Sequence, residues 1–200
     1  MSRLTALVAC LVLLVTGCTT SPPRQPNDLC HVFTEKDDWY AEAKQAEKKW
    51  GSPVHITMAL MRQESGFRAD AKPPRGRLLW VIPWFRPSSA YGYPQAKDET
   101  WDWYQDKSGN GWSSRDNFDD AVDFVAWYNH ITHKRIGIQP TDTYSLYLAY
   151  HEGHSGFEQR SFDSKPWLKA VASKVSTRAN QYQQQLAGCE HRLQDDGWFF

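Results

Sequence analysis

The sequence has no excess of charge of either sign. Lysine and arginine together number 23, and aspartate and glutamate also number 23, so the formal net charge is zero. Binding to a polyanion needs a basic patch or a strongly basic domain, so we expect no nucleic-acid partner. The sequence also shows no internal repeat and no linker to a second domain, which favours a single domain.

The sequence has no long hydrophobic run, and its longest apolar segment is a short one near the N-terminus. Residues 7–15 are apolar apart from Cys10 and follow a single basic residue, Arg3. A transmembrane helix needs roughly 20 apolar residues, so this run is too short to span a bilayer. It fits a signal peptide over residues 1–17, whose removal leaves a chain long enough for one sizeable core.

The end of this segment, VTGC at 15–18, resembles the lipobox of bacterial lipoproteins. The resemblance implies lipidation at Cys18, a Pro-rich tether over 18–29 and membrane association through the N-terminal lipid anchor. Thr19 follows Cys18 where an aspartate could stand. By resemblance to Gram-negative lipoproteins, this implies a location on the periplasmic face of the outer membrane. The alternative is an ordinary signal peptide that contains a chance cysteine.

Cysteine is scarce, with four residues in the whole chain. Cys10 leaves with the signal and Cys18 is assigned to lipid, so Cys30 and Cys189 remain near the two ends of the globular region. An oxidising periplasm permits a disulfide between them. Closing so long a loop would stabilise the fold by about 4–5 kcal/mol on the entropy model. The alternative is a pair of free buried thiols.

Apolar periodicity predicts a mainly α-helical domain over 30–190, followed by a tail over 191–200. We expect one helix from Thr34, as N-cap, to Trp50, and one that starts at Pro53 with Ser52 as N-cap. The further expected helices cover 98–106, 117–136, 142–151 and 166 onward.

Residues 72–89 contain four prolines and cannot form one regular helix. We expect an irregular or short β insertion here, with 78–82 as a strand. It is either an ordinary packed insertion, a wall of a cleft, or a surface that touches the membrane. The ten tryptophans likewise fit either a well-filled core or a sugar-binding cleft.

Glu64 stands where the pattern of its helix calls for an apolar residue. Ile56, Leu60 and Glu64 are spaced by four and share one helix face. Desolvation and the negative end of the helix dipole should both raise the pKa of this carboxyl group. An acid that is protonated near neutral pH suits cleavage of a glycosidic bond. The alternative is a glutamate that ends the helix or pairs with Arg62 or Arg68.

Three segments in order resemble the soluble lytic transglycosylase family, which has the goose-lysozyme-like fold. They are ESGF at 64–67 with Ala71, AYGYPQ at 90–95, and LAYHEG at 148–153. The sequence departs from the family pattern at Tyr93-Pro94, in place of Leu-Met, and at His151-Glu152, in place of Asn-Ala. The resemblance implies a peptidoglycan substrate, a mainly α-helical lysozyme-like domain and no cofactor.

The resemblance also implies residue roles. Glu64 would protonate the glycosidic oxygen between N-acetylmuramic acid and N-acetylglucosamine, and then accept the proton of the muramyl C6 hydroxyl to give a 1,6-anhydro product. Tyr150 would donate a hydrogen bond toward Glu64. The expected substrate-binding residues are Ser65, Tyr91, Tyr93, Gln95, His151 and Glu152.

Three other functions stay open. Glu152 could act with Glu64 as the second carboxylate of a hydrolytic muramidase, provided that the two carboxyl groups leave room for a water. A lipoprotein that binds peptidoglycan without turnover would fit the altered segments. A zinc peptidase fits poorly, because His154 comes one residue too early for HExxH, although His130 and His133 have chelating spacing. We expect no metal, and no particular protein partner is indicated.

Overall fold

The computed structural model describes residues 21–195 except 75–76, 79–81 and 84–87. This part of the chain is mainly α-helical, so the predicted fold class is confirmed. The predicted signal peptide and Cys18 lie outside the described residues. The helices are α2 (Leu29–Glu35), α3 (Trp39–Trp50), α4 (Val54–Glu64), α5 (Asp98–Ser108), α6 (Phe118–Ile136), α7 (Thr143–Glu158) and α8 (Pro166–Asp195), with a 3-10 helix η2 (Ser161–Ser164) before α8.

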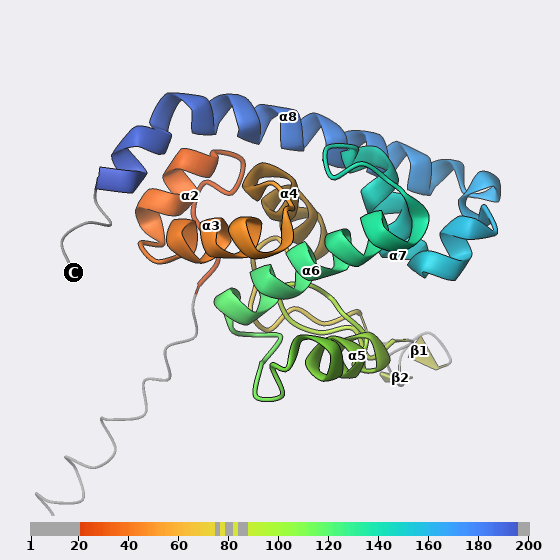
Figure 1. The fold of residues 1–200 in the computed structure, drawn as a ribbon. Helices are drawn as coiled ribbons and strands as arrows, with labels where there is room; N and C mark the ends of the chain where they lie inside the picture. Colours follow the sequence, from red (N-terminus) through yellow and green to blue (C-terminus); the bar gives the residue numbers. More distant parts are fainter. Residues whose placement is uncertain (1–20, 75–76, 79–81, 84–87, 196–200) are drawn as a thin grey trace, which may run out of the picture.

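Helix α6 lies at the centre of the domain, and the long helix α8 runs along one side of it (Figure 1). Helix α6 packs on α3, α4 and α7, while α8 covers α2, α4 and α7. Asn117 caps α6 by accepting a hydrogen bond from the Asp120 amide, at the start of the helix predicted over 117–136, and Gly137 ends it in the left-handed region. Helices α4 and α7 therefore each contact both α6 and α8.

The predicted helix from Thr34 to Trp50 is two helices, because the chain breaks between Glu35 and Trp39. Asp28 caps α2 by accepting a hydrogen bond from the His31 amide. Thr34 does not act as a cap, since its hydroxyl donates to the carbonyl of Cys30 four residues back, within α2.

Helix α4 begins one residue later than predicted, with Pro53 in extended conformation at the N-cap position. Ser52 does not cap it. Its hydroxyl instead bonds the hydroxyl of Thr57 and accepts from the Asn129 amide, so that it ties α4 to α6. Helix α7 runs past the predicted end at His151, with a kink at Gly153 (φ 74°), and α8 continues through Asp195, into the predicted tail.

Residues 72–89 contain two short antiparallel strands, β1 (Arg77–Leu78) and β2 (Ile82–Pro83), in which Leu78 pairs with Ile82. Leu78 and Ile82, the two ends of the single strand expected over 78–82, thus belong to two antiparallel strands, and residues 79–81 between them lie outside the described residues. The hairpin and α5 lie on the opposite side of the domain from α8 (Figure 1). No helix in the described ranges is long and apolar enough to cross a membrane.

The predicted disulfide between Cys30 and Cys189 is confirmed, with the two Cα atoms 6.1 Å apart. It joins α2 to α8, which also meet where the Leu29 amide donates to Gln185 Oε1 at 2.8 Å. The hydroxyl of Tyr182 donates to the carbonyl of Pro26, so the end of the predicted tether lies against α8.

Most tryptophans in the described residues pack inside the domain, as a well-filled core requires. Trp39, for example, stacks on Phe118 with ring centroids 3.8 Å apart. Two remain exposed: Trp112, in the connection between α5 and α6, is 100% exposed, and Trp167, at the start of α8, is 56% exposed.

Candidate active site

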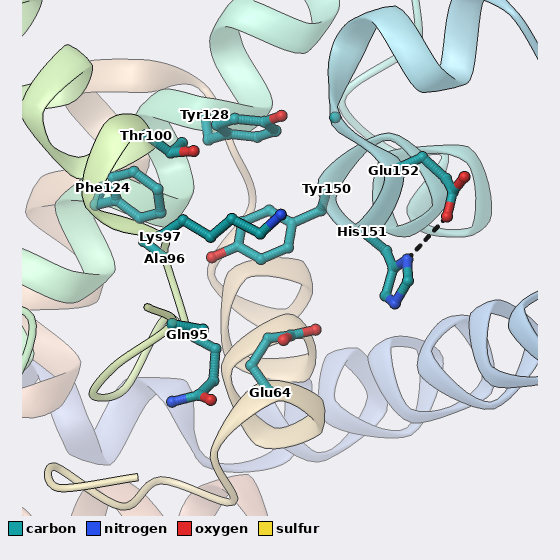
Figure 2. Close-up of a pocket in the computed structure, with 12 residues that line it drawn as sticks. Glu64, Gln95, Ala96, Lys97, Thr100, Phe124, Tyr128, Tyr150, His151 and Glu152 are labelled. Atoms are coloured by element: carbon teal, nitrogen blue, oxygen red, sulfur yellow. Dashed lines mark hydrogen bonds and ion pairs between the residues drawn. The ribbon is translucent and has the colours of Figure 1, made fainter. Parts of the chain in front are cut away.

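Glu64 is the last residue of α4 and lines a cavity of about 440 Å³. Leu60 and Ile56, one and two turns earlier on the same face, are fully buried, so the carboxyl group continues an apolar stripe as predicted. The other walls come from residues 90–97 and from α5, α6 and α7. Figure 2 shows Gln95 on one side of Glu64 and His151 on the other.

Burial raises the pKa of Glu64 to about 7, against an ordinary value of 4.5, although a hydrogen bond from Tyr147 lowers it. The alternative of an ion pair with a neighbouring arginine is not supported. Arg62 donates to Asn27 and Arg68 donates to the Ser65 carbonyl, and neither forms an ion pair with Glu64 in the described part of the chain. A carboxyl group with this pKa can hold a proton at neutral pH and also release one.

We expect the activity of the site to depend on pH through Glu64. The protonated form is the one that can donate, so kcat/KM should be maximal below pH 7 and fall about tenfold per unit above it. Initial rates of release of soluble material from purified peptidoglycan between pH 5 and pH 9 would test this, with circular dichroism as the control for folding. Activity that stays level up to pH 9 would contradict the assignment of the acid.

Tyr147 is a site residue that the sequence reasoning missed. Its side chain is buried, and its hydroxyl hydrogen-bonds the carboxyl group of Glu64. Burial and the charge of Glu64 both raise the pKa of the Tyr147 hydroxyl, so it stays a hydrogen-bond donor at any physiological pH. Tyr147 lies three residues before Tyr150, hence one turn away on a similar face of α7. That spacing was the available signal.

Tyr147→Phe should shift the alkaline limit of activity to higher pH. The hydrogen bond favours the anion of Glu64, so its loss raises the pKa of that carboxyl group further. The lost orientation should also lower kcat by about tenfold. The pH profile of kcat/KM checks this, because a purely structural role for Tyr147 would lower the rate without moving the limit. Tyr144→Phe, on the same helix, is the matched control.

Tyr150 lines the cavity, but its contact differs from the predicted one. Its hydroxyl donates to the carbonyl of Pro94 at 2.6 Å. A tyrosine hydroxyl has one hydrogen, so the predicted donation to Glu64 is wrong in this structure. Burial and then the charge of Glu64 raise the pKa of Tyr150, which places the two groups near each other. Tyr150 therefore fixes the 90–95 segment to α7 beside Glu64.

Ala71 and Gln95 hold the 90–95 segment against the chain that follows α4. The carbonyl of Ala71 accepts from the Gly92 amide and from Gln95 Nε2, both at 2.9 Å. Gly92 has φ 72°, and a Cβ atom there would lie 2.0 Å from the carbonyl oxygen of Arg115, so only glycine fits. These bonds close the chain across the 72–89 insertion and place Gln95 at the cavity, as predicted.

Two predicted substrate-binding residues are corrected by the structure. Tyr93 is 1% exposed and packs edge-to-face on Trp39 and Phe118, so it is a core residue that no ligand can reach. Ser65 is 5% exposed, and its hydroxyl donates to the Met61 carbonyl and accepts from the Phe67 amide. Ser65 therefore caps the C-terminal end of α4.

Tyr91 is outside the residues that line the cavity. Its hydroxyl donates to the Asp116 carboxylate at 3.0 Å, and Lys72 lies over its ring with Nζ 5.0 Å from the ring centroid. The prediction that Tyr91 binds substrate is not tested by these contacts. It would apply only to a ligand that extends beyond the cavity.

His151 and Glu152 both line the cavity, but Glu152 is already fully engaged. Its side chain is 3% exposed and accepts from Lys165 Nζ at 2.7 and 2.9 Å, from the Ser161 hydroxyl and from His151 Nδ1 at 3.0 Å. Burial would raise the pKa of Glu152, but these hydrogen bonds outweigh burial and lower it to about 2. In Figure 2 the carboxylate lies beyond His151 as seen from Glu64.

The remaining histidines considered as metal ligands each bond another group. Nδ1 of His130 bonds the Trp50 carbonyl, Nδ1 of His133 bonds the Ile138 carbonyl, and His154 Nε2 bonds the hydroxyl of Thr132. Within the described ranges, no three His, Cys, Asp or Glu side chains are grouped so that they could hold a metal ion.

Comparison with known proteins gives one family. Residues 6–189 match the model of the transglycosylase SLT domain, which covers most of the chain. Comparisons with curated proteins and with solved structures gave no significant match. The matched range includes all three segments that carry the resemblance, and the structure brings Glu64, Gln95 and Tyr150 from these segments to one cavity. The chain therefore belongs to the transglycosylase SLT domain family.

Proposed function

We propose that this protein is a peptidoglycan lytic transglycosylase that cleaves the β-1,4 bond from N-acetylmuramic acid to N-acetylglucosamine. The observation that carries the proposal is the carboxyl group of Glu64, with a pKa of about 7, at the wall of a cavity formed by all three family segments. Membership of the transglycosylase SLT domain family supports peptidoglycan as the substrate.

In the proposed reaction, Glu64 alone moves the proton. Its carboxyl group protonates the bridging oxygen as the bond between that oxygen and the muramyl C1 breaks, which releases the N-acetylglucosamine end. The muramyl C6 oxygen then bonds C1, and the Glu64 carboxylate takes the proton of that hydroxyl. The product is a 1,6-anhydro ring, and Glu64 ends the cycle protonated. No water is consumed.

The contacts of Glu152 disfavour a hydrolytic muramidase. A second carboxylate that activates water needs an oxygen free to accept the proton of that water. Both Glu152 oxygens already accept hydrogen bonds: Oε1 from His151 and Lys165, and Oε2 from Ser161 and Lys165. A pKa of about 2 also makes this carboxylate a weak base.

The N-terminal lipoprotein anchor and the outer-membrane location form part of the proposal. They are supported by the VTGC sequence at 15–18 and by Thr19. Mass spectrometry of the mature N-terminal peptide, purified from an exporting host, would test them by showing whether Cys18 is the acylated first residue.

Product analysis tests the reaction. A soluble form that begins after Cys18 is incubated with purified sacculi, and the released sugars are identified by mass spectrometry. Anhydro-muramyl ends support transglycosylation, whereas reducing muramyl ends identify a hydrolase. If the folded protein binds sacculi and releases nothing, the chain is a non-catalytic peptidoglycan-binding protein.

A further inference from the structure

Trp167 is an exposed aromatic residue that the proposed reaction does not use. It is the second residue of α8 and is 56% exposed. A single exposed apolar side chain is common on protein surfaces and is not by itself a site. The position of Trp167 beside the catalytic cavity is what distinguishes it from the other exposed tryptophan, Trp112.

A continuous row of aromatic rings connects Glu64 with Trp167. Tyr147 hydrogen-bonds Glu64, and its ring lies against that of His151, with centroids 6.4 Å apart. His151 lines the cavity, and its ring packs on Trp167 with centroids 5.3 Å apart. The row therefore leads from the carboxyl group of Glu64, through His151 at the wall of the cavity, to the exposed Trp167.

The geometry of the last pair leaves the indole available. The rings of His151 and Trp167 are nearly perpendicular, with an interplanar angle of 77°. In such a pair, the edge of one ring meets the face of the other, so at least one face of the indole is not covered by His151. A flat apolar face of this kind, next to a cavity with polar groups, suits the C–H face of a sugar ring.

The buried carboxylate of Glu152 holds the His151 ring and fixes the chain just before Trp167. It accepts hydrogen bonds from His151 and from Lys165, which lies two residues before Trp167. Ser161, in the helical turn before α8, is its third partner. Side chains fixed before binding lose less conformational entropy when a ligand arrives, so this network prepares the pair for binding. It also gives the buried Glu152 a role that the proton transfer does not.

We propose that Trp167 and His151 form a further sugar-binding position, where an N-acetylhexosamine ring of the glycan strand stacks on the indole as the strand leaves the cavity. The proposal rests on the proposed function for the identity of the strand. In this proposal, the histidine at position 151, where the family has asparagine, serves to support the Trp167 indole.

The test measures binding without turnover, in the Glu64→Gln background, by calorimetry with an N-acetylglucosamine hexamer. Trp167→Ala should raise Kd about tenfold, as truncation of a tryptophan at the centre of a contact does. Trp167→Phe retains a flat ring and should restore most of the affinity. The matched control is Trp112→Ala, which removes the other exposed indole and should change Kd less than about twofold.

In the active protein, Trp167→Ala should raise KM on purified glycan strands and leave kcat within about twofold, because the indole lies outside the reacting bond. Equal Kd values for Trp167→Ala and Trp112→Ala would overturn the proposal. A loss that Trp167→Phe does not restore would also overturn it, since it would indicate lost packing on His151. Failure of the proposed function would look different. The wild type would then form no anhydro product, whereas the Kd for the hexamer would still show whether Trp167 binds sugar.

Discussion

Glu64→Gln should lower the rate of anhydro-muropeptide release by about a thousandfold or more. Glutamine has the same size but cannot donate a proton as an acid, and general acid catalysis contributes about 10²–10⁴-fold. The same group also acts as the base in the second half of the proposed reaction, so both halves fail. Release of anhydro-muropeptides from sacculi, quantified by mass spectrometry, measures the loss.

Thermal unfolding of the wild type and of Glu64→Gln at several pH values shows whether the variant is folded. It also shows whether the pKa of Glu64 is raised in the folded protein. The folded-state pKa of about 7 lies above the ordinary 4.5, so between these values the folded protein holds a proton that the unfolded chain has lost. Wild-type stability should therefore fall as the pH rises from 4.5 to 7, by up to about 3 kcal/mol. The variant lacks this loss, so its Tm should match the wild type near pH 4.5 and exceed it at pH 8.5.

Glu158→Gln is the matched control for the Glu64 variant. Glu158 lies at the end of α7, where its exposed carboxylate pairs with Arg135 at 3.0 Å. Its loss should leave the rate within about twofold, since exposed ion pairs contribute little. If Glu64→Gln retains more than a tenth of the wild-type rate, Glu64 is not the acid and the proposed mechanism is wrong.

The helices could be predicted from the sequence wherever a local signal marks them. Asn117 caps α6, Gly51 and Gly137 end their helices in the left-handed region, and the spacing of Ile56 and Leu60 places Glu64 on a buried face. Each of these signals acts within one or two turns of the residue that carries it. The raised pKa of Glu64 follows from the same local pattern and from burial.

Contacts between distant segments could not be read from the sequence. The bond from Tyr150 to the carbonyl of Pro94 depends on how α7 meets the 90–95 segment, and Tyr147 takes the place expected for Tyr150 beside Glu64. The pattern of residues in a loop does not show which aromatic ring enters the core, so the sequence does not predict that Tyr93 is buried. The break before Trp39 likewise goes with a tertiary contact, the edge-to-face pair of Phe33 on α2 and Tyr40 on α3.

Glu152 shows how a family departure can be structural. Because Glu152 is an acid within a family segment, sequence reasoning predicts that it either binds the glycan or acts as a second carboxylate. Its partners Lys165 and Ser161 come from the turn before α8, which no motif connects with α7. The buried network is visible only when the two segments are placed together.

Removal of the disulfide should lower the stability of the domain strongly. Cys30 and Cys189 are separated by 159 positions, and release of so long a loop should lower the free energy of unfolding by about 4–5 kcal/mol. For a domain of this size, that corresponds to a fall in Tm of about 10–20 °C. The measurement is thermal unfolding of a Cys30→Ser, Cys189→Ser double variant, followed by circular dichroism.

The site should survive this change at low temperature, because the disulfide joins α2 to α8 while Glu64 and Tyr147 lie on α4 and α7. Hydrogen bonds between the same two elements remain, such as that from the Leu29 amide to Gln185. Rates near 15 °C should thus stay close to the wild type even though Tm falls. If the double variant melts with the wild type, and if thiol labelling of the unreduced wild type finds both cysteines free, the disulfide does not form in solution. The alternative of two unpaired buried thiols is then correct, and the packing of α2 on α8 holds the N-terminal helix in place without it.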